Sequence, residues 1–241
     1  MQVSRGNRFR FPAIAGLALF LLMVSGFVLD IAIIGTTGGD PQIRVDQLGP
    51  DLVRVKNSAI WPVEGWIYTL MILPALVFLA GVHWAFRRVD EDGVAAIGVV
   101  VTATFWALST AHNLAILTVV QSLAPVYVPG APEAVAIEAV SRSLVWVADA
   151  LSPLSGLGAV FLIVGALALG RATLTSKELP RWTGYIALSS ALLLGLGTFQ
   201  HLSRPLIAVS LIGFILYMVW VAGMSVTLLR RWRGASASDG G

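Results

Sequence analysis

The chain contains six apolar runs, each long enough to cross a lipid bilayer. They cover roughly residues 12–35, 65–86, 94–121, 145–170, 182–203 and 205–230. A hydrocarbon core of about 30 Å takes roughly 20 residues of α-helix to cross. Because the runs are continuous rather than alternating, and because each backbone polar group in lipid must be satisfied within its own segment, they predict helices rather than strands. The predicted fold class is an all-α integral membrane bundle of six transmembrane helices.

The composition agrees with this class. Of the 241 residues 57% are hydrophobic and 12% are charged, whereas soluble proteins have about 25% charged residues. The segments between the runs are too short to build a separate soluble core, so we predict one transmembrane domain over residues 1–233 and a disordered polar tail over 234–241. The first run is longer than the apolar part of a signal peptide, which predicts a retained span.

The distribution of basic residues predicts the orientation. Eleven Lys and Arg residues flank one side of the predicted bundle, which includes both termini, and five flank the other. The positive-inside rule then places both termini in the cytoplasm. An even number of spans requires the same arrangement, so the two inferences support each other.

Two extracytoplasmic connections are expected from turn residues and mixed charge. Residues 36–62 contain Gly-Gly-Asp-Pro and Gly-Pro breakers and form the larger connection. Residues 122–146 begin with proline-rich turns and continue as an amphipathic piece that we expect along the outer surface. In that piece Glu138 and Arg142 stand four residues apart, which favours a helical ion pair.

Polar residues inside the predicted spans all fall in the outer half of the bundle. Ionised groups in lipid cost about 2.5 to 3.5 kcal/mol on insertion scales, so such residues normally face the bundle interior or water. Helical spacing places several of them on shared stripes beside small residues, and we predict an outward-opening polar pocket. The candidate ligand-binding residues are Asp30, Trp106, His112, Asn113, Asp149, Gln200, His201 and Arg204.

Several of these residues have a purely structural alternative. Trp106 could stack on a ligand or pack in the core, and His112 could be a ligand, a base or a hydrogen-bonding residue. Asp30 or Asp149 could be the buried ion-pair partner of Arg204, and Asp149 could instead cap the fourth span. Glu64 is expected in the first turn of its helix, after Pro62.

The sequence carries little evidence for an enzyme. There is no zinc-protease, nucleophile-elbow or phosphate-loop motif, and with no cysteine there is no thiolate site. No cofactor is therefore predicted. As alternatives, His112 and His201 could hold a haem, or, with Asp149, a divalent metal. The basic residues lie beside apolar runs, where lipid headgroups explain them, so no nucleic-acid partner is expected.

One segment resembles a known family. Leu179, Pro180, Arg181, Trp182 and Gly184 form a Leu-Pro-Arg-Trp-x-Gly junction before a late helix. This junction is similar to one in a bacterial family of small polytopic membrane proteins of unknown function, whose first helix is also similar to residues 11–30. The resemblance implies a multi-pass protein of the bacterial inner membrane and no particular activity.

The sequence therefore predicts a multi-pass membrane protein whose outward-facing pocket binds a small molecule or lipid headgroup, for sensing, transport assistance or regulation of a membrane-protein partner. A haem- or metal-dependent redox protein or enzyme is one alternative. A structural subunit of a membrane complex is another.

Overall fold

A computed structural model describes residues 7–37, 43–87, 90, 92–154, 156–199, 203 and 205–238. All regular elements in these residues are helical. In chain order they are α1 (Asn7–Thr37), η1 (Val45–Gln47), α2 (Leu48–Lys56), α3 (Ile60–Leu70), α4 (Ile72–Phe86), α5 (Val94–Thr118), η2 (Val119–Leu123), η3 (Ala124–Val126), α6 (Ala134–Leu151), α7 (Leu157–Thr175), α8 (Arg181–Gly197) and α9 (Pro205–Ser238).

Five stretches of the described chain are long and apolar enough to cross a membrane. They are Phe9–Thr36, Ile60–Phe86, Val94–Val126, Leu157–Thr175 and Pro205–Gly234. The second of these combines α3 and α4, which meet at Met71. The protein is thus an all-helical membrane protein that crosses the bilayer several times. α8 has 17 residues and packs between α7 and α9.

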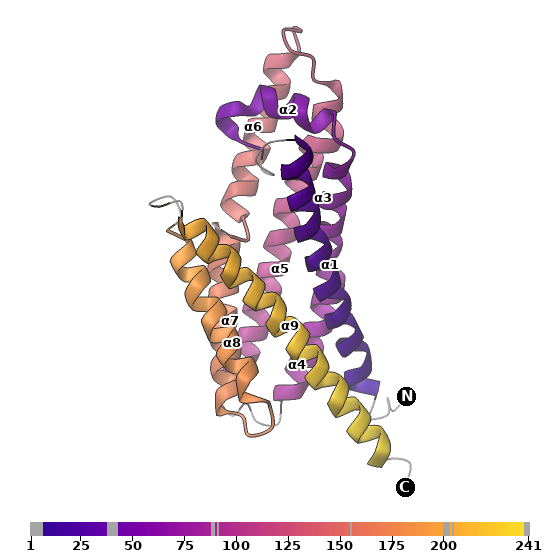
Figure 1. Cartoon of the computed structure of the whole chain (residues 1–241), viewed down its shortest axis with the longest axis vertical. Coiled ribbons are helices and arrows are strands. Elements are labelled where there is room, and N and C mark those ends of the chain that lie inside the picture. Colours follow the sequence, from indigo (N-terminus) through magenta and orange to yellow (C-terminus); the bar gives the residue numbers. More distant parts are fainter. Residues whose placement is uncertain are drawn as a thin grey trace.

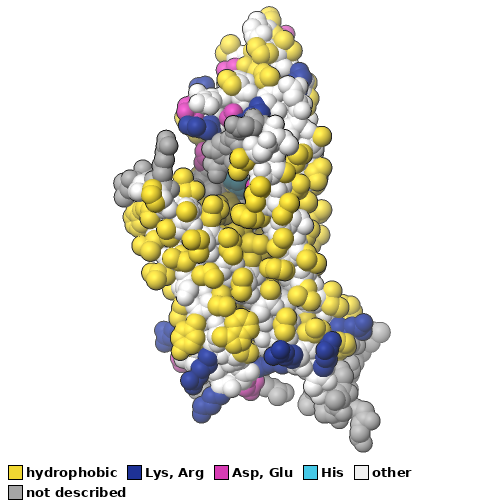
Figure 2. All heavy atoms as spheres, viewed as in Figure 1, with side chains coloured by type: hydrophobic (Ala, Val, Ile, Leu, Met, Phe, Trp, Pro, Cys, Tyr) yellow, Lys and Arg dark blue, Asp and Glu magenta, His cyan; other side chains and the backbone are white. Residues whose placement is uncertain are grey.

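The helices form an elongated bundle with two different ends. Figure 1 shows the beginning of α1, the end of α9 and the α7–α8 turn at one end, which we call the base. At the opposite end, α2, α6 and the upper parts of α1, α3 and α5 extend beyond α7, α8 and α9, and we call this part the head. Figure 2 shows charged side chains at the base and on the head, with a belt of hydrophobic side chains between them.

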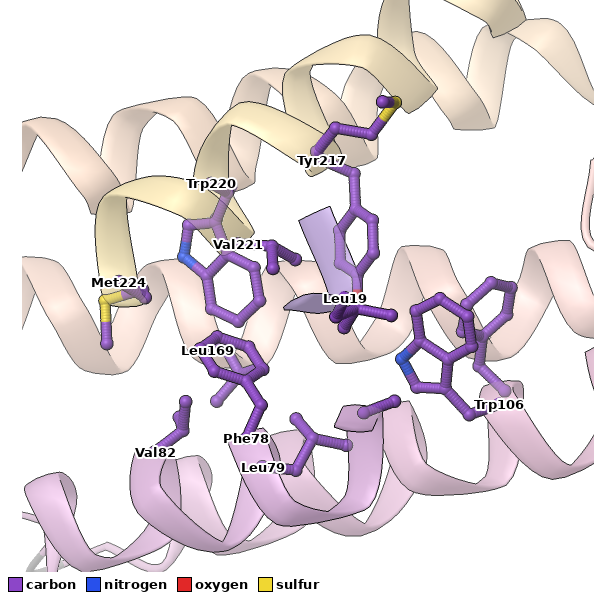
Figure 3. Packing of buried hydrophobic residues seen from close by; sticks show 14 of the residues in the cluster. Leu19, Phe78, Leu79, Val82, Trp106, Leu169, Tyr217, Trp220, Val221 and Met224 are labelled. Carbon is purple, nitrogen blue, oxygen red and sulfur yellow. The ribbon is translucent and has the colours of Figure 1, made fainter. Parts of the chain in front are cut away.

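The core of the bundle is aromatic at its centre (Figure 3). Trp220 meets the ring of Phe78 edge-on with centroids 5.9 Å apart, and it stacks on Tyr217 at 5.6 Å. Elsewhere small residues allow close approach of two helices. A Cβ added to Gly165 in α7 would lie 2.3 Å from Oγ1 of Thr102 in α5. We call the part of the bundle below the head the lower bundle. It is held by tight contacts between helices, as is usual for helices in lipid.

Polar side chains tie the base together. The guanidinium of Arg231 in α9 donates to the backbone oxygen of Ala85, at 3.2 Å, and to both the backbone oxygen and the carboxylate of Glu178, at 2.9 and 3.2 Å. Arg10 lies over the ring of Trp232, and Arg87 over that of Trp84. The arginines at this end thus fix the ends of α1, α4, α8 and α9 relative to one another.

The head has a hydrophobic core of its own. α2 buries Leu48, Leu52 and Val55 on one face, at the spacing of an amphipathic helix. These side chains pack with Trp61 and, among others, with Val119 after the end of α5. The connection expected at 36–62 therefore contains a helix that covers the top of α3 and α5.

The fourth predicted span, 145–170, is not a single helix. α6 ends at Leu151 and α7 begins at Leu157, with a turn that contains Pro153 between them. Proline and an extended Ser152 interrupt the helix because a proline nitrogen has no hydrogen to donate. The membrane-length helix here is α7 alone, and α6 belongs to the head.

Two other expectations differ from the structure. α6 stands upright against α5 instead of lying along the outer surface (Figure 1), because it buries small residues spaced by seven positions, Ala134, Ser141 and Ala148. The tail predicted as disordered over 234–241 is helical as far as Ser238, since α9 continues past the membrane-length stretch. Residues 239–241 lie outside the described part.

Candidate polar site near the head

Polar residues from three helices lie at a similar height in the bundle. At 1.5 Å per residue, Asp30 is 21 residues or about 32 Å from Phe9, and Glu64 is 22 residues or about 33 Å from Phe86. His112 is 18 residues or about 27 Å from Val94 by the same count. Since the hydrocarbon core is about 30 Å thick, these side chains fall near the membrane boundary on the head side. We call this level the polar layer.

Asp30, Glu64 and Tyr68 form a hydrogen-bonded cluster between α1 and α3. The hydroxyl of Tyr68 donates to Oδ2 of Asp30 at 2.7 Å. The carboxyl of Glu64, which is buried, lies close enough to that of Asp30 for the two groups to interact. Glu64 and Tyr68 are four residues apart, so they share one face of α3. The cluster therefore joins two helices that come from different parts of the chain.

A close approach of the two carboxyls is favourable when they share a proton. A carboxylate has acceptors only, so a hydrogen bond between two carboxyls exists only when one of them is protonated. Two adjacent carboxylates without that proton would repel each other in a place where water is scarce. The cluster can therefore hold a proton, or a small cation in its place.

Glu64 differs from its expected role. The sequence predicts it in the first turn of its helix, but α3 begins at Ile60, before Pro62, and no acidic residue occupies the first turn. The carboxyl of Glu64 is turned into the bundle toward Asp30. Because a buried carboxyl needs a partner, Glu64 belongs to the candidate site.

His112 joins α5 to α6. Its Nδ1 lies 2.7 Å from the backbone oxygen of Ala148. A carbonyl oxygen only accepts, so Nδ1 carries the hydrogen, and in the neutral ring Nε2 is left as an acceptor. Asp149, the next residue of α6, is exposed and close enough to interact electrostatically with the ring. Asp149 lies inside the last turn of α6 and does not cap a membrane span.

The other predicted residues have different surroundings. Asn113 donates from Nδ2 to the backbone oxygen of Ser109 in its own helix, at 2.8 Å. Trp106 is 3% exposed and meets Phe105 edge-on with centroids 5.1 Å apart, which is the packing alternative. Gln200, His201 and Arg204 lie outside the described residues.

The structure thus brings together two groups at the polar layer, Asp30 with Glu64 and Tyr68, and His112 with Ala148 and Asp149. Within the described residues no three His, Asp or Glu side chains are grouped so as to hold a metal ion. Sequence reasoning missed Tyr68 and the role of Glu64. Their spacing of four residues, level with Asp30, is the signal that could have found them.

Comparison with protein-family models, with curated proteins and with solved structures finds no match to this chain.

Proposed function

We propose that this chain is a six-span protein of the bacterial inner membrane, with its head outside the cytoplasm, and that the polar layer binds a small molecule or lipid headgroup. α8 is the span to be added to the five membrane-length stretches, since it runs back beside α7 and returns the chain to the side from which α9 starts (Figure 1). With six crossings both termini lie on the same side, and the arginines of the base mark that side as cytoplasmic.

The observation that carries the binding proposal is the contact between Asp30 and Glu64. Two helices deliver one carboxyl each to the same point, and the tyrosine hydroxyl of Tyr68 orients one of them. A structural role alone needs only one carboxyl and one donor. The second carboxyl gives the cluster the capacity to exchange its proton for a cationic group.

The class of ligand follows from this exchange. An ammonium group, in a free amine or in a lipid headgroup, can replace the proton and donate to both carboxylates at once. Such an exchange changes the contact between α1 and α3, which is how binding outside could be sensed or passed to a partner. The protein therefore acts as an outward-facing binding protein, in sensing, transport assistance or partner regulation.

The proposal is tested with Glu64→Gln in lipid nanodiscs. When ethanolamine is added in weak buffer, we expect the wild type to release protons as the amine binds, and Glu64→Gln to release none, since the amide has no proton to exchange. Glu133→Gln, a change of an exposed acid just before α6 in the head, is the matched control and should behave as the wild type. Equal proton release from wild type and Glu64→Gln would contradict the exchange.

The same pair of proteins tests the shared proton directly. As the pH rises, loss of a shared proton leaves two carboxylates close together, so the thermal midpoint of the wild type should fall. Glu64→Gln keeps a donor at every pH, so its midpoint should not show this fall. Parallel curves for the two proteins would show that the carboxyls do not share a proton.

A second function, as a subunit of a membrane complex, is favoured by α6. Four large apolar residues of this helix are exposed, Val135, Val140, Trp146 and Val147. Exposed apolar patches of this kind mark contact surfaces for proteins or membranes. Photo-crosslinking from position 140 in cells would test it, because a structural subunit should give one discrete crosslinked protein.

A further inference from the structure

A cleft in the head lies between the η1–α2 segment and α6. Its volume is about 500 Å³, which is in the range of sites for small molecules. We call it the head cleft. It is lined by Val45, Asp46, Gln47, Leu48, Gly49, Pro50, Val53, Tyr127, Pro129, Glu138 and Arg142. None of these residues belongs to the polar layer.

The charged groups of the head cleft are arranged differently from the sequence prediction. Glu138 and Arg142 do not form the expected helical ion pair. Oε1 of Glu138 instead accepts a hydrogen bond from the hydroxyl of Tyr127, at 2.5 Å. Arg142 is exposed and forms no ion pair with any described residue. The cleft thus presents a guanidinium that has no partner in the part of the chain that the structure describes.

The Tyr127–Glu138 contact is built into the cleft wall. A Cβ added to Gly49 would lie 2.9 Å from the hydroxyl of Tyr127 and 3.3 Å from Oε1 of Glu138. A side chain at this position would displace the end of the Tyr127 side chain. The hydrogen bond to Glu138 also raises the pKa of the Tyr127 hydroxyl, so it remains a donor near neutral pH. One oxygen of Glu138 is therefore occupied by Tyr127, and no described donor bonds to the other.

The charges in the head cleft balance. Asp46 is paired with Arg44 at 3.1 Å, which leaves Glu138 and Arg142 as one negative and one positive group. A purely anionic ligand would meet the carboxylate, and a purely cationic ligand would meet the guanidinium. Residues four apart on a helix are about 5 to 6 Å apart at their Cβ atoms, so the two side chains can reach the opposite charges of one small zwitterion.

We propose that the head cleft binds a small zwitterion, with its anionic group on Arg142, its ammonium group on Glu138 and an aliphatic part against Val45 and Val53. This site goes beyond the proposed function, since it uses none of the same residues. An amino acid with an aliphatic side chain has this chemistry, and so does the phosphoethanolamine of a lipid headgroup. Arg142 is seven residues, about 10 Å, before Asp149 on α6, which places the cleft on the water side of the polar layer and favours a dissolved ligand.

Binding to purified protein in detergent, measured by calorimetry, tests the proposal. The probes are L-leucine, which carries both charges, N-acetyl-L-leucine, which lacks the ammonium, L-leucinamide, which lacks the carboxylate, and phosphoethanolamine. We expect saturable binding of leucine or of phosphoethanolamine, at least tenfold tighter than that of either single-charge analogue. Leucine binding indicates a dissolved amino acid, and binding of phosphoethanolamine alone indicates the lipid source.

Variants assign the charges. Arg142→Ala should weaken binding of the zwitterion at least tenfold, and Arg142→Lys should restore part of it. Glu138→Gln should remove the preference for the zwitterion over the N-acetyl analogue. Arg181→Ala, an exposed arginine at the base, is the matched control. Glu64→Gln should leave binding of the zwitterion unchanged, so a failure of the head-cleft proposal can be distinguished from a failure of the carboxyl exchange.

Three outcomes would overturn the proposal. The first is that neither zwitterion binds saturably at millimolar concentration. The second is that the single-charge analogues bind as tightly as the zwitterion. The third is that Arg142→Ala, with the same thermal midpoint as the wild type, binds the zwitterion as tightly as the wild type does. Arg142 is exposed, so its replacement is not expected to prevent folding.

Discussion

The lower bundle and the head are built partly from the same helices, but different forces hold them together. In the lower bundle the contacts rest on glycines, on residues such as Thr102 and on the aromatic centre around Trp220. In the head they rest on an amphipathic helix that buries Leu48, Leu52 and Val55. Lipid tails are as apolar as leucine, so only close packing distinguishes a partner helix from lipid. The proposed orientation places the head in water, where burial of leucine and valine is favourable.

The largest expected effect is a difference in labelling between the two sides of the membrane. If this difference is not found, the comparison between the head and the lower bundle fails. The chain has no cysteine, so single cysteines can be introduced without a background. Glu133→Cys, a change of an exposed residue just before α6 in the head, should react in whole cells with a membrane-impermeant maleimide. Lys177→Cys, in the α7–α8 turn, should react only after lysis. The reverse pattern would invert the orientation and place the head in the cytoplasm.

The next largest effect is on the stability of the head. Leu52 is fully buried in its core, and replacement by alanine should cost about 2 to 5 kcal/mol. The loss should be local, with faster hydrogen–deuterium exchange in α2 and α6 and unchanged exchange in α7 and α8. Val128→Ala, a change of an exposed residue of the head, is the control. Faster exchange throughout the bundle would show that the head is not a separate cooperative unit.

Replacement of two glycines by alanine should have smaller effects on stability, of opposite sign, and these effects sharpen the comparison. Gly165→Ala places a Cβ against Thr102 and should cost about 1 to 3 kcal/mol, because two helices must move apart. Gly195 is also in a bundle helix, but a Cβ there would have no atom within 4 Å. Gly195→Ala should instead stabilise by about 0.5 to 1 kcal/mol. Thermal midpoints in detergent would measure both, and a loss of similar size at both sites would contradict the packing argument.

The smallest effect concerns Tyr127 and pH. The hydrogen bond to Glu138 raises the pKa of the Tyr127 hydroxyl in the folded protein. A raised folded pKa gives stability that is present below the unfolded pKa and is lost as the pH rises through the folded pKa. The head should therefore loosen slightly at alkaline pH, and Tyr127→Phe should remove this dependence. Exchange of α2 amides at neutral and alkaline pH would measure it, and unchanged pH dependence in the variant would contradict it.

Much of the fold could be predicted from the sequence, but less of the site. The runs that become α1, α3–α4, α5, α7 and α9 are apparent because a bilayer demands length and continuous hydrophobicity. The boundary in the run at 145–170 is not apparent, although Pro153 lies within it, because α6 is apolar enough to extend the run. For the site, the level of Asp30 and His112 followed from counting residues, whereas their partners Tyr68 and Ala148 are 38 and 36 residues away in the chain.

The sequence by itself determined that the chain is a multi-pass helical membrane protein, and it indicated at which level of the bundle the polar residues gather. These properties depend on the hydrophobicity and spacing of residues within one segment. Tertiary structure alone decided that Glu64 faces Asp30, that Glu138 binds Tyr127 instead of Arg142, and that α2 and α6 form a head. Each of these depends on which helix lies beside which, and a side chain chooses its partner from all the groups within reach in space.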